Sequence, residues 1–118
     1  MREEIKMEIN SSKHEDIRIL EITGRLDANT APDLEKELLQ HLDAEEKYFL
    51  VNFSGLDYIS SVGLRVLLMA AKKAKAVGGK VVLSGLQEHV HEVFEIAGFT
   101  SIFQIFAGND EALSVYHG

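Results

Sequence analysis

The feature of this sequence that most restricts its fold is the apolar run YFLVNF at residues 48–53. A run rich in β-forming residues is typical of a strand that is covered on both faces or lies at the centre of a parallel sheet. Amphipathic helical patterns flank it, with leucines recurring every four residues over 34–42 and apolar residues sharing one helical face over 61–77. The run therefore predicts an α/β protein in which this strand is central.

The other segments continue this alternation. Residues 4–10 and 17–24 each alternate apolar and polar positions, which predicts two half-buried strands joined by a hairpin turn at SSKHED. Thr30 is the expected N-cap of the first helix, and Gly78-Gly79 the expected end of the second. The remaining expected elements are strands at 80–85 and 101–106, a helix at 87–97, and a short last helix capped by Asn109 or Asp110. The order β-β-α-β-α-β-α-β-α predicts a single-domain α/β protein, a mixed β-sheet with helices packed on it and right-handed crossovers.

Composition and charge argue against several classes of protein. The length of 118 residues suits about one domain, expected over residues 1–118. The absence of cysteine removes disulfides and Cys-ligated zinc, and a net charge of −7 argues against nucleic acid as a partner. No apolar run approaches the ~20 residues of a membrane helix, and the N-terminus lacks a secretory pattern, so we expect a cytoplasmic protein without membrane insertion.

Enzymatic interpretations find little support in the motifs. Neither a G-x-S-x-G elbow nor a phosphate-binding P-loop is present, and Asp57, an isolated aspartate, is more typical of a turn than of a general base. The histidines are scattered, and nothing in the sequence pairs one of them with a serine; they are His14, His41, His89, His91 and His117. We therefore expect a protein that is not an enzyme and has no catalytic residue, cofactor or metal site.

One strand-to-helix connection, FSGLDYISSVGL at 53–64, is chemically distinctive. It places Ser60 and Ser61 at the start of the second helix, on the edge where open α/β sheets bind ligands. A serine there commonly caps a backbone N–H group. The alternative is phosphorylation, because a phosphate gains from the free N–H groups and the dipole of a helix N-terminus. The residues alone leave both interpretations open.

Three pieces of the chain, in order and at matching separations, resemble the STAS-domain family of bacterial anti-sigma factor antagonists. The segment ITGRLDANTAPDL (22–34) resembles the signature that joins a strand to the first helix, and LVNFSGLDYISSVGLRVLL (50–68) resembles the family's strand, loop and Ser-x-Gly-Leu helix start. The segment GGKVVLSGLQEHVHEVFEIAGFTSIFQIF (78–106) resembles its later strand-helix-strand run. The resemblance covers essentially the whole chain.

The resemblance implies a phosphorylation site and a binding face. The serine two residues before Gly-Leu is the family's phosphoacceptor, which corresponds to Ser61 here; family members often carry aspartate just before it, where this chain has Ser60, the second choice. The first signature, around Asp27 and Thr30, is assigned to the same partner-binding face. The expected partner-binding residues are therefore Asp27, Thr30, Asp57, Ser60, Ser61 and Gly63.

The resemblance also implies a mechanism. The unmodified protein would bind an anti-sigma factor that is also a serine-protein kinase, and so release a sigma factor. The kinase would then phosphorylate Ser61 and dissociate, and a serine phosphatase would reset the cycle. The alternatives are a STAS scaffold or adaptor, in a stress-signalling particle or a lipid-transport complex, and a nucleotide-binding protein.

Overall fold

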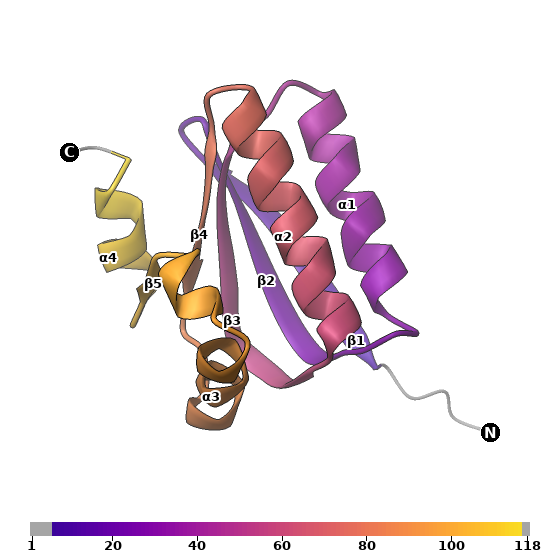
Figure 1. Cartoon of the computed structure of the whole chain (residues 1–118). Coiled ribbons are helices and arrows are strands. Elements are labelled where there is room, and N and C mark those ends of the chain that lie inside the picture. Colours follow the sequence, from indigo (N-terminus) through magenta and orange to yellow (C-terminus); the bar gives the residue numbers. More distant parts are fainter. Residues whose placement is uncertain (1–5, 117–118) are drawn as a thin grey trace.

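The computed structural model describes residues 6–116 as a five-stranded mixed sheet with helices on both faces (Figure 1). The strands are β1 (Met7–His14), β2 (Ile17–Leu26), β3 (Tyr48–Ile59), β4 (Lys80–Ser84) and β5 (Ile105–Phe106). The helices are α1 (Ala31–Asp43), α2 (Ser61–Ala76), α3 (Glu88–Ile96) and α4 (Asn109–Ser114). In the sheet order β1-β2-β3-β4-β5, only β1 is antiparallel to its neighbour. The predicted element order and the central place of the 48–53 strand are confirmed.

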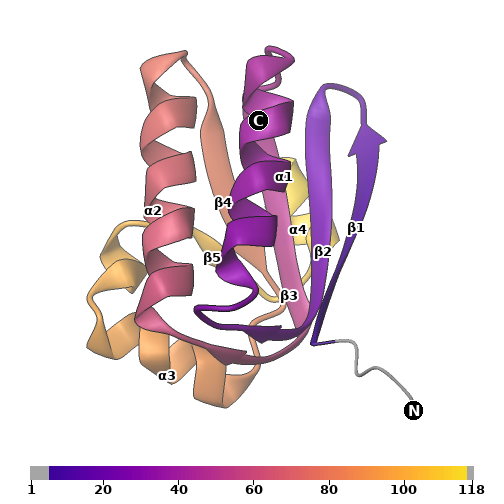
Figure 2. The same ribbon diagram turned by 90° about the vertical axis from the view of Figure 1, so that its right-hand side faces the viewer.

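Burial on both faces of the first half of β3 explains the apolar run at residues 48–53. Helices α1 and α2 cover one face of the sheet, and α4 packs on the other (Figures 1 and 2). Phe49, Val51 and Phe53 belong to the larger core cluster, together with buried residues of α1, α2 and α3, whereas Leu50 packs with Ala112 of α4 on the opposite face. Alternate residues of a strand point to opposite faces, so a strand covered on both must be apolar at nearly every position.

Three element boundaries differ from the sequence-based expectation. The polar residues 11–14, predicted as a turn, continue β1 and pair with β2, and the turn is reduced to 15–16; residues 4 and 5 of the expected first strand lie outside the described residues. Strand β3 continues to Ile59, where a loop was expected from residue 53. The expected 101–106 strand is reduced to β5, because Phe99–Ser101 forms a 3₁₀ turn.

The predicted cap of the last helix is also wrong. The N-cap of α4 is Gly108, so Asn109 is the first helical residue and Asp110 the second. The side-chain oxygen of Asn109 instead accepts hydrogen bonds from Asn52 Nδ2 at 2.9 Å and from Ser84 Oγ at 2.8 Å. Asn109 therefore fastens the helix to two central strands, which satisfies the hydroxyl of the fully buried Ser84.

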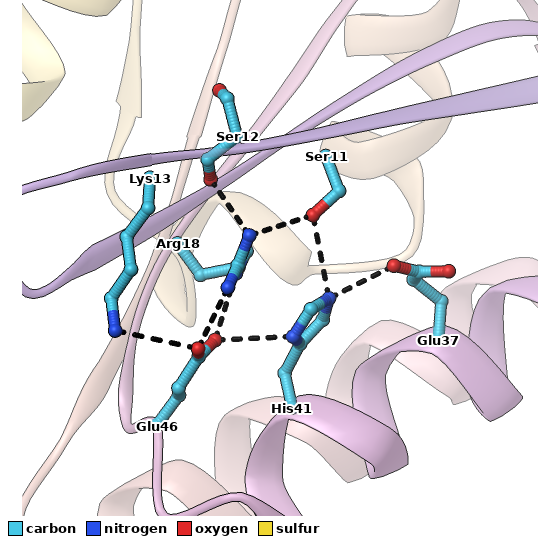
Figure 3. A network of polar contacts seen from close by, with 7 residues as sticks. All are labelled: Ser11, Ser12, Lys13, Arg18, Glu37, His41 and Glu46. Carbon is cyan, nitrogen blue, oxygen red and sulfur yellow. Dashed lines mark hydrogen bonds and ion pairs between the residues drawn. The ribbon is translucent and has the colours of Figure 1, made fainter.

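A polar network fastens the β1–β2 hairpin to α1 (Figure 3). Arg18 on β2 binds the carboxylate of Glu46 through two parallel hydrogen bonds of 2.8 and 2.7 Å. His41 of α1 lies between two carboxylates, 3.1 Å from Glu46 and 2.9 Å from Glu37. The side chain of Glu46 is only 12% exposed, so its carboxylate depends on these partners in place of water.

We expect this network to make the protein acid-labile. The hydrogen bonds from Arg18 are the main influence on the pKa of Glu46 and, against the opposing effect of desolvation, lower it to about 2. A lowered pKa stabilises the folded state above the carboxyl's ordinary pKa, and this stabilisation is lost as the pH falls from about 5 towards 2. Glu46→Gln should therefore reduce the free energy of unfolding by on the order of 3 kcal/mol at pH 7. The difference in free energy of unfolding between this variant and the protein with Glu46 should shrink steadily towards pH 2.

Urea unfolding at several pH values measures this difference. The matched control is Glu35→Gln, because Glu35 is an exposed glutamate of α1. A Glu46→Gln deficit that stayed constant between pH 7 and pH 2 would show that the carboxylate charge is not the cause.

Candidate functional site

Two chain connections meet where strands β2 and β3 end, at the end of the sheet that also holds the first turns of α1 and α2 (Figure 2). The backbone N–H of Ser60, just before α2, donates a 2.9 Å hydrogen bond to the carbonyl of Leu26, the last residue of β2. This bond joins the residue 27–30 loop to the start of α2. The surface built around it, called here the switch face, comprises residues 25–30 and 57–61.

The loop that contains Asp27 is shaped by its own side chains. Asp27 Oδ1 accepts hydrogen bonds from the N–H groups of Asn29, at 2.9 Å, and Thr30, at 3.2 Å. Partial desolvation acts to raise the pKa of Asp27, but these two N–H groups and the neighbouring Arg25 outweigh it and hold the pKa below its ordinary value. The carboxylate is therefore charged and oriented within the loop.

Thr30 does not have the predicted capping contact. It occupies the N-cap position of α1, but its side chain makes no cap hydrogen bond to the helix. The hydroxyl turns back into the loop, where it donates to the Arg25 carbonyl at 2.8 Å and accepts from the Asp27 N–H at 2.9 Å. Thr30 is only 6% exposed, so it shapes the switch face from beneath.

Irregularities in β3 set the path of the chain just before α2. The β2–β3 register shifts twice, between Glu21 and Thr23 and again between Gly24 and Arg25, and each shift inserts an extra residue in β3. Such bulges re-aim the side chains around them. The second shift exposes Asp57 and Tyr58 together, and the Arg25 guanidinium lies 4.3 Å from the centre of the Tyr58 ring. This cation–π pair has no signal in the sequence, because it depends on the bulged register.

The two serines have different environments. Ser60 is the N-cap of α2, and its Oγ accepts a 3.3 Å hydrogen bond from the Gly63 N–H. Ser61 is the first residue of α2 and is exposed. Its hydroxyl makes no side-chain hydrogen bond to any residue between 6 and 116. Ser60 therefore caps α2, and the hydroxyl of Ser61 remains accessible.

Gly63 permits the close approach of α2 to the end of β2. A Cβ atom at this buried glycine would lie 2.7 Å from Leu26 Cγ and 3.1 Å from Ile59 Cγ1. Real Cβ contacts are longer than this, so a larger side chain would displace α2. Gly63 therefore belongs to the support of the switch face and offers no side chain to a partner.

Side chains of the N-cap and first turn of α3 cover the outer edge of β3 beside the switch face. Strand β4 pairs with β3 only as far as Asn52, so the following part of β3 has no strand on that side among the described residues. Gln87 Nε2 donates to the Ser54 carbonyl at 3.1 Å, and His89 Nε2 lies 2.6 Å from the Asp57 carbonyl oxygen. Both residues fall in the helix predicted at 87–97, but the sequence carries no signal for these contacts, which depend on the unexpected length of β3.

The chemistry of the switch face suits recognition. It presents a hydroxyl, an oriented carboxylate, an arginine–tyrosine pair and the N-terminus of a helix. In the described part of the chain, neither serine forms a hydrogen bond with a histidine. Between residues 6 and 116, no group of three or more metal-ligating side chains could hold a metal ion. Over the same residues, none of the helices has both the length and the apolar character needed to cross a membrane.

The geometry agrees with a comparison against known families. The sequence model of the STAS domain matches residues 8–112. The chain belongs to the STAS-domain family. The matched region includes both connections that form the switch face, and the resemblance recognised in the sequence is confirmed.

Curated STAS relatives are described as regulators. BtrV of Bordetella bronchiseptica, provisionally described as an anti-sigma factor antagonist, is 38% identical over 93% of this chain and 95% of its own length. The anti-sigma-B factor antagonist of Listeria monocytogenes is 32% identical over 86% of this chain and 88% of its own length.

The STAS fold is also shared with solved structures. The anti-sigma factor antagonist SpoIIAA in its unphosphorylated form superposes with a TM-score of 0.83 at 18% identity, over 94% of this chain and 97% of that one. The phosphorylated form of SpoIIAA, from Bacillus, gives a TM-score of 0.74 at 17% identity, over 92% and 99% of the two chains. At this identity the likeness establishes the fold.

Proposed function

We propose that this protein is an anti-sigma factor antagonist that binds its partner through the switch face and is switched off by phosphorylation of Ser61. The partner would be an anti-sigma factor that is also a serine-protein kinase, and a serine phosphatase would reverse the modification. Asp27, Asp57 and Ser60 would lie in the contact, with Thr30 and Gly63 supporting it. No catalytic role is proposed for any residue of this chain.

One observation carries this proposal. The hydrogen bond from the Ser60 N–H to the Leu26 carbonyl unites two separate chain segments in one surface, and the accessible hydroxyl of Ser61 lies at its edge. The descriptions of the curated relatives support antagonism of an anti-sigma factor. SpoIIAA, which shares the fold, has a phosphorylated form, and this supports modification as the means of control.

The direction of the switch follows from electrostatics. Phosphorylation would add roughly −1.5 to −2 charges at the first residue of α2, where the helix N-terminus tolerates an anion. The fold would therefore survive the modification. In the complex, however, the phosphate would have to lose water in an interface that already contains the Asp27 carboxylate. Desolvation and like-charge repulsion would oppose binding.

Comparing two aspartates tests the position of the binding face. Asp27→Ala should weaken binding to an anti-sigma factor by about tenfold, a loss of about 1.4 kcal/mol. The matched control is Asp110→Ala, because Asp110 is exposed on α4, which packs on the opposite face of the sheet. Isothermal titration against each purified anti-sigma factor of the source organism gives both affinities. Equal losses for the two variants, or a larger loss for Asp110→Ala, would place the binding face elsewhere.

A further inference from the structure

A second surface lies at the other end of α2, about 16 Å along the helix from Ser61 at the standard rise per residue. An open groove of about 530 Å³ runs between the C-terminal half of α2, the start of β4 and the residues before β5. Its apolar lining consists of Leu68, Ala71, Val81, Ile102 and Phe103. Ile102 is 51% exposed, although Phe103 beside it is buried. The groove therefore leaves apolar surface in contact with water.

The groove follows an unpaired strand edge. Strand β5 pairs with β4 only at Leu83 and Ser84, so the first half of β4 has no strand on its outer side among residues 6–116. The N–H of Lys80 donates to the carbonyl of Lys47, the residue just before β3, whereas the N–H of Leu83 donates outward to the Gln104 carbonyl. Because these directions alternate along a strand, Val81 turns its N–H and C=O outward. In the described part of the chain, no backbone group pairs with them.

Lysines line the rim of this groove. They are Lys72 and Lys75 of α2 and Lys80 of β4, and all three are exposed. The chain as a whole carries a net charge of −7, so this cationic rim contrasts with the rest of the molecule. Edge-to-edge pairing with a second copy would oppose lysines to lysines, which is unfavourable. A segment with carboxylates would meet complementary charge.

We propose that this groove binds an extended acidic segment of a partner protein, which adds a strand to the open edge of β4. Its backbone would pair with the outward N–H and C=O of Val81. An apolar side chain would enter between Leu68 and Ile102, and flanking carboxylates would pair with Lys72 and Lys75. Main-chain hydrogen bonds would supply affinity, and the apolar and charged contacts would supply specificity, as in other strand-addition complexes. This surface is independent of the switch face.

The test is a titration of the ¹⁵N-labelled full chain with a blocked heptapeptide of alternating glutamate and valine, followed by NMR. We expect chemical-shift changes at Val81 and Ile102 but not at Ser61, and slower hydrogen exchange of the Val81 amide. Lys75→Glu should weaken binding at least fivefold, and Ile102→Ser by a similar factor. The matched control is Lys73→Glu, since Lys73 lies in the same last turn of α2 but does not line the groove.

Two peptide controls separate strand addition from general attraction. Two versions of the acidic peptide are N-methylated at alternate amides, one in each register. One of the two should fail to bind, because its methyl groups replace the N–H donors that face β4. A heptapeptide of alternating lysine and valine should not bind.

Several results would overturn the proposal. They are the absence of binding by the acidic peptide, an equal loss for Lys73→Glu and Lys75→Glu, and binding by both methylated peptides. Sedimentation equilibrium of the free protein is the last check, because a dimer that Ile102→Ser dissociates would make a second copy the occupant. None of these results would count against the proposed binding of an anti-sigma factor at the switch face.

Discussion

Replacement of Ser61 by aspartate is expected to weaken binding to an anti-sigma factor by about a hundredfold while leaving the fold intact. The carboxylate takes the first position of α2, where the helix dipole favours an anion. In the complex the same charge would be desolvated next to the partner. A loss of ~3 kcal/mol corresponds to roughly a hundredfold in affinity. Isothermal titration measures the affinity, and the thermal unfolding midpoint checks that the variant is folded.

Two serine-to-alanine variants distinguish the acceptor from the cap. Ser61→Ala should bind the partner with full affinity but should take no phosphate from the kinase, as measured by intact mass. Ser60→Ala should still be phosphorylated. It should lose about 0.5–2 kcal/mol of stability, because the Ser60 hydroxyl accepts the hydrogen bond from the Gly63 N–H. If labelling disappears in Ser60→Ala and persists in Ser61→Ala, the acceptor has been assigned one residue too late.

The second large effect is expected in the aromatic cluster beneath α3. Phe94 is fully buried and lies at the centre of this cluster, with ring centroids 6.4, 6.1 and 6.5 Å from those of Phe53, Phe99 and Phe103. Phe94→Ala should lower the free energy of unfolding by about 3–5 kcal/mol, because it removes a large side chain from a packed site and leaves a cavity. Denaturant unfolding measures the loss.

Ile96 offers a matched control on the same helix. It is 88% exposed, so Ile96→Ala should change stability by no more than about 0.5 kcal/mol. If Phe94→Ala cost as little as Ile96→Ala, α3 would not be held on the sheet by its aromatic residue. Another interaction would then have to hold α3 in the position from which Gln87 and His89 reach β3.

The fold was predictable wherever burial determines composition. YFLVNF identified the central strand because its side chains are buried on both faces of the sheet. The prediction failed at β1, because residues 11–14 are polar on an exposed edge and their pairing depends on the backbone of β2. It failed again in the second half of β3, since a serine, a glycine and an aspartate suggest a turn. The bulges of the β2–β3 pairing accommodate these residues within a strand.

The position of the candidate site in the fold was predictable, but its detailed geometry was not. The helix-start pattern located both serines at the N-terminus of α2, and the structure places them there. Which serine caps depends on the geometry of a single turn, and the sequence has no signal for that. The inward turn of the Thr30 hydroxyl depends on an acceptor five residues earlier, the Arg25 carbonyl. The Arg25–Tyr58 pair depends on strand register, which tertiary packing decides.

The bond between the Ser60 N–H and the Leu26 carbonyl also bears on the newly synthesised chain. The two segments that it joins flank α1 and are brought together by the parallel pairing of β2 with β3. Parallel pairing requires the crossover helix to be in place and is a slow, non-local step of folding. A truncated or unfolded chain therefore presents neither half of the surface in its working geometry. Under the proposed function, a damaged or incomplete chain would therefore be unable to bind its partner.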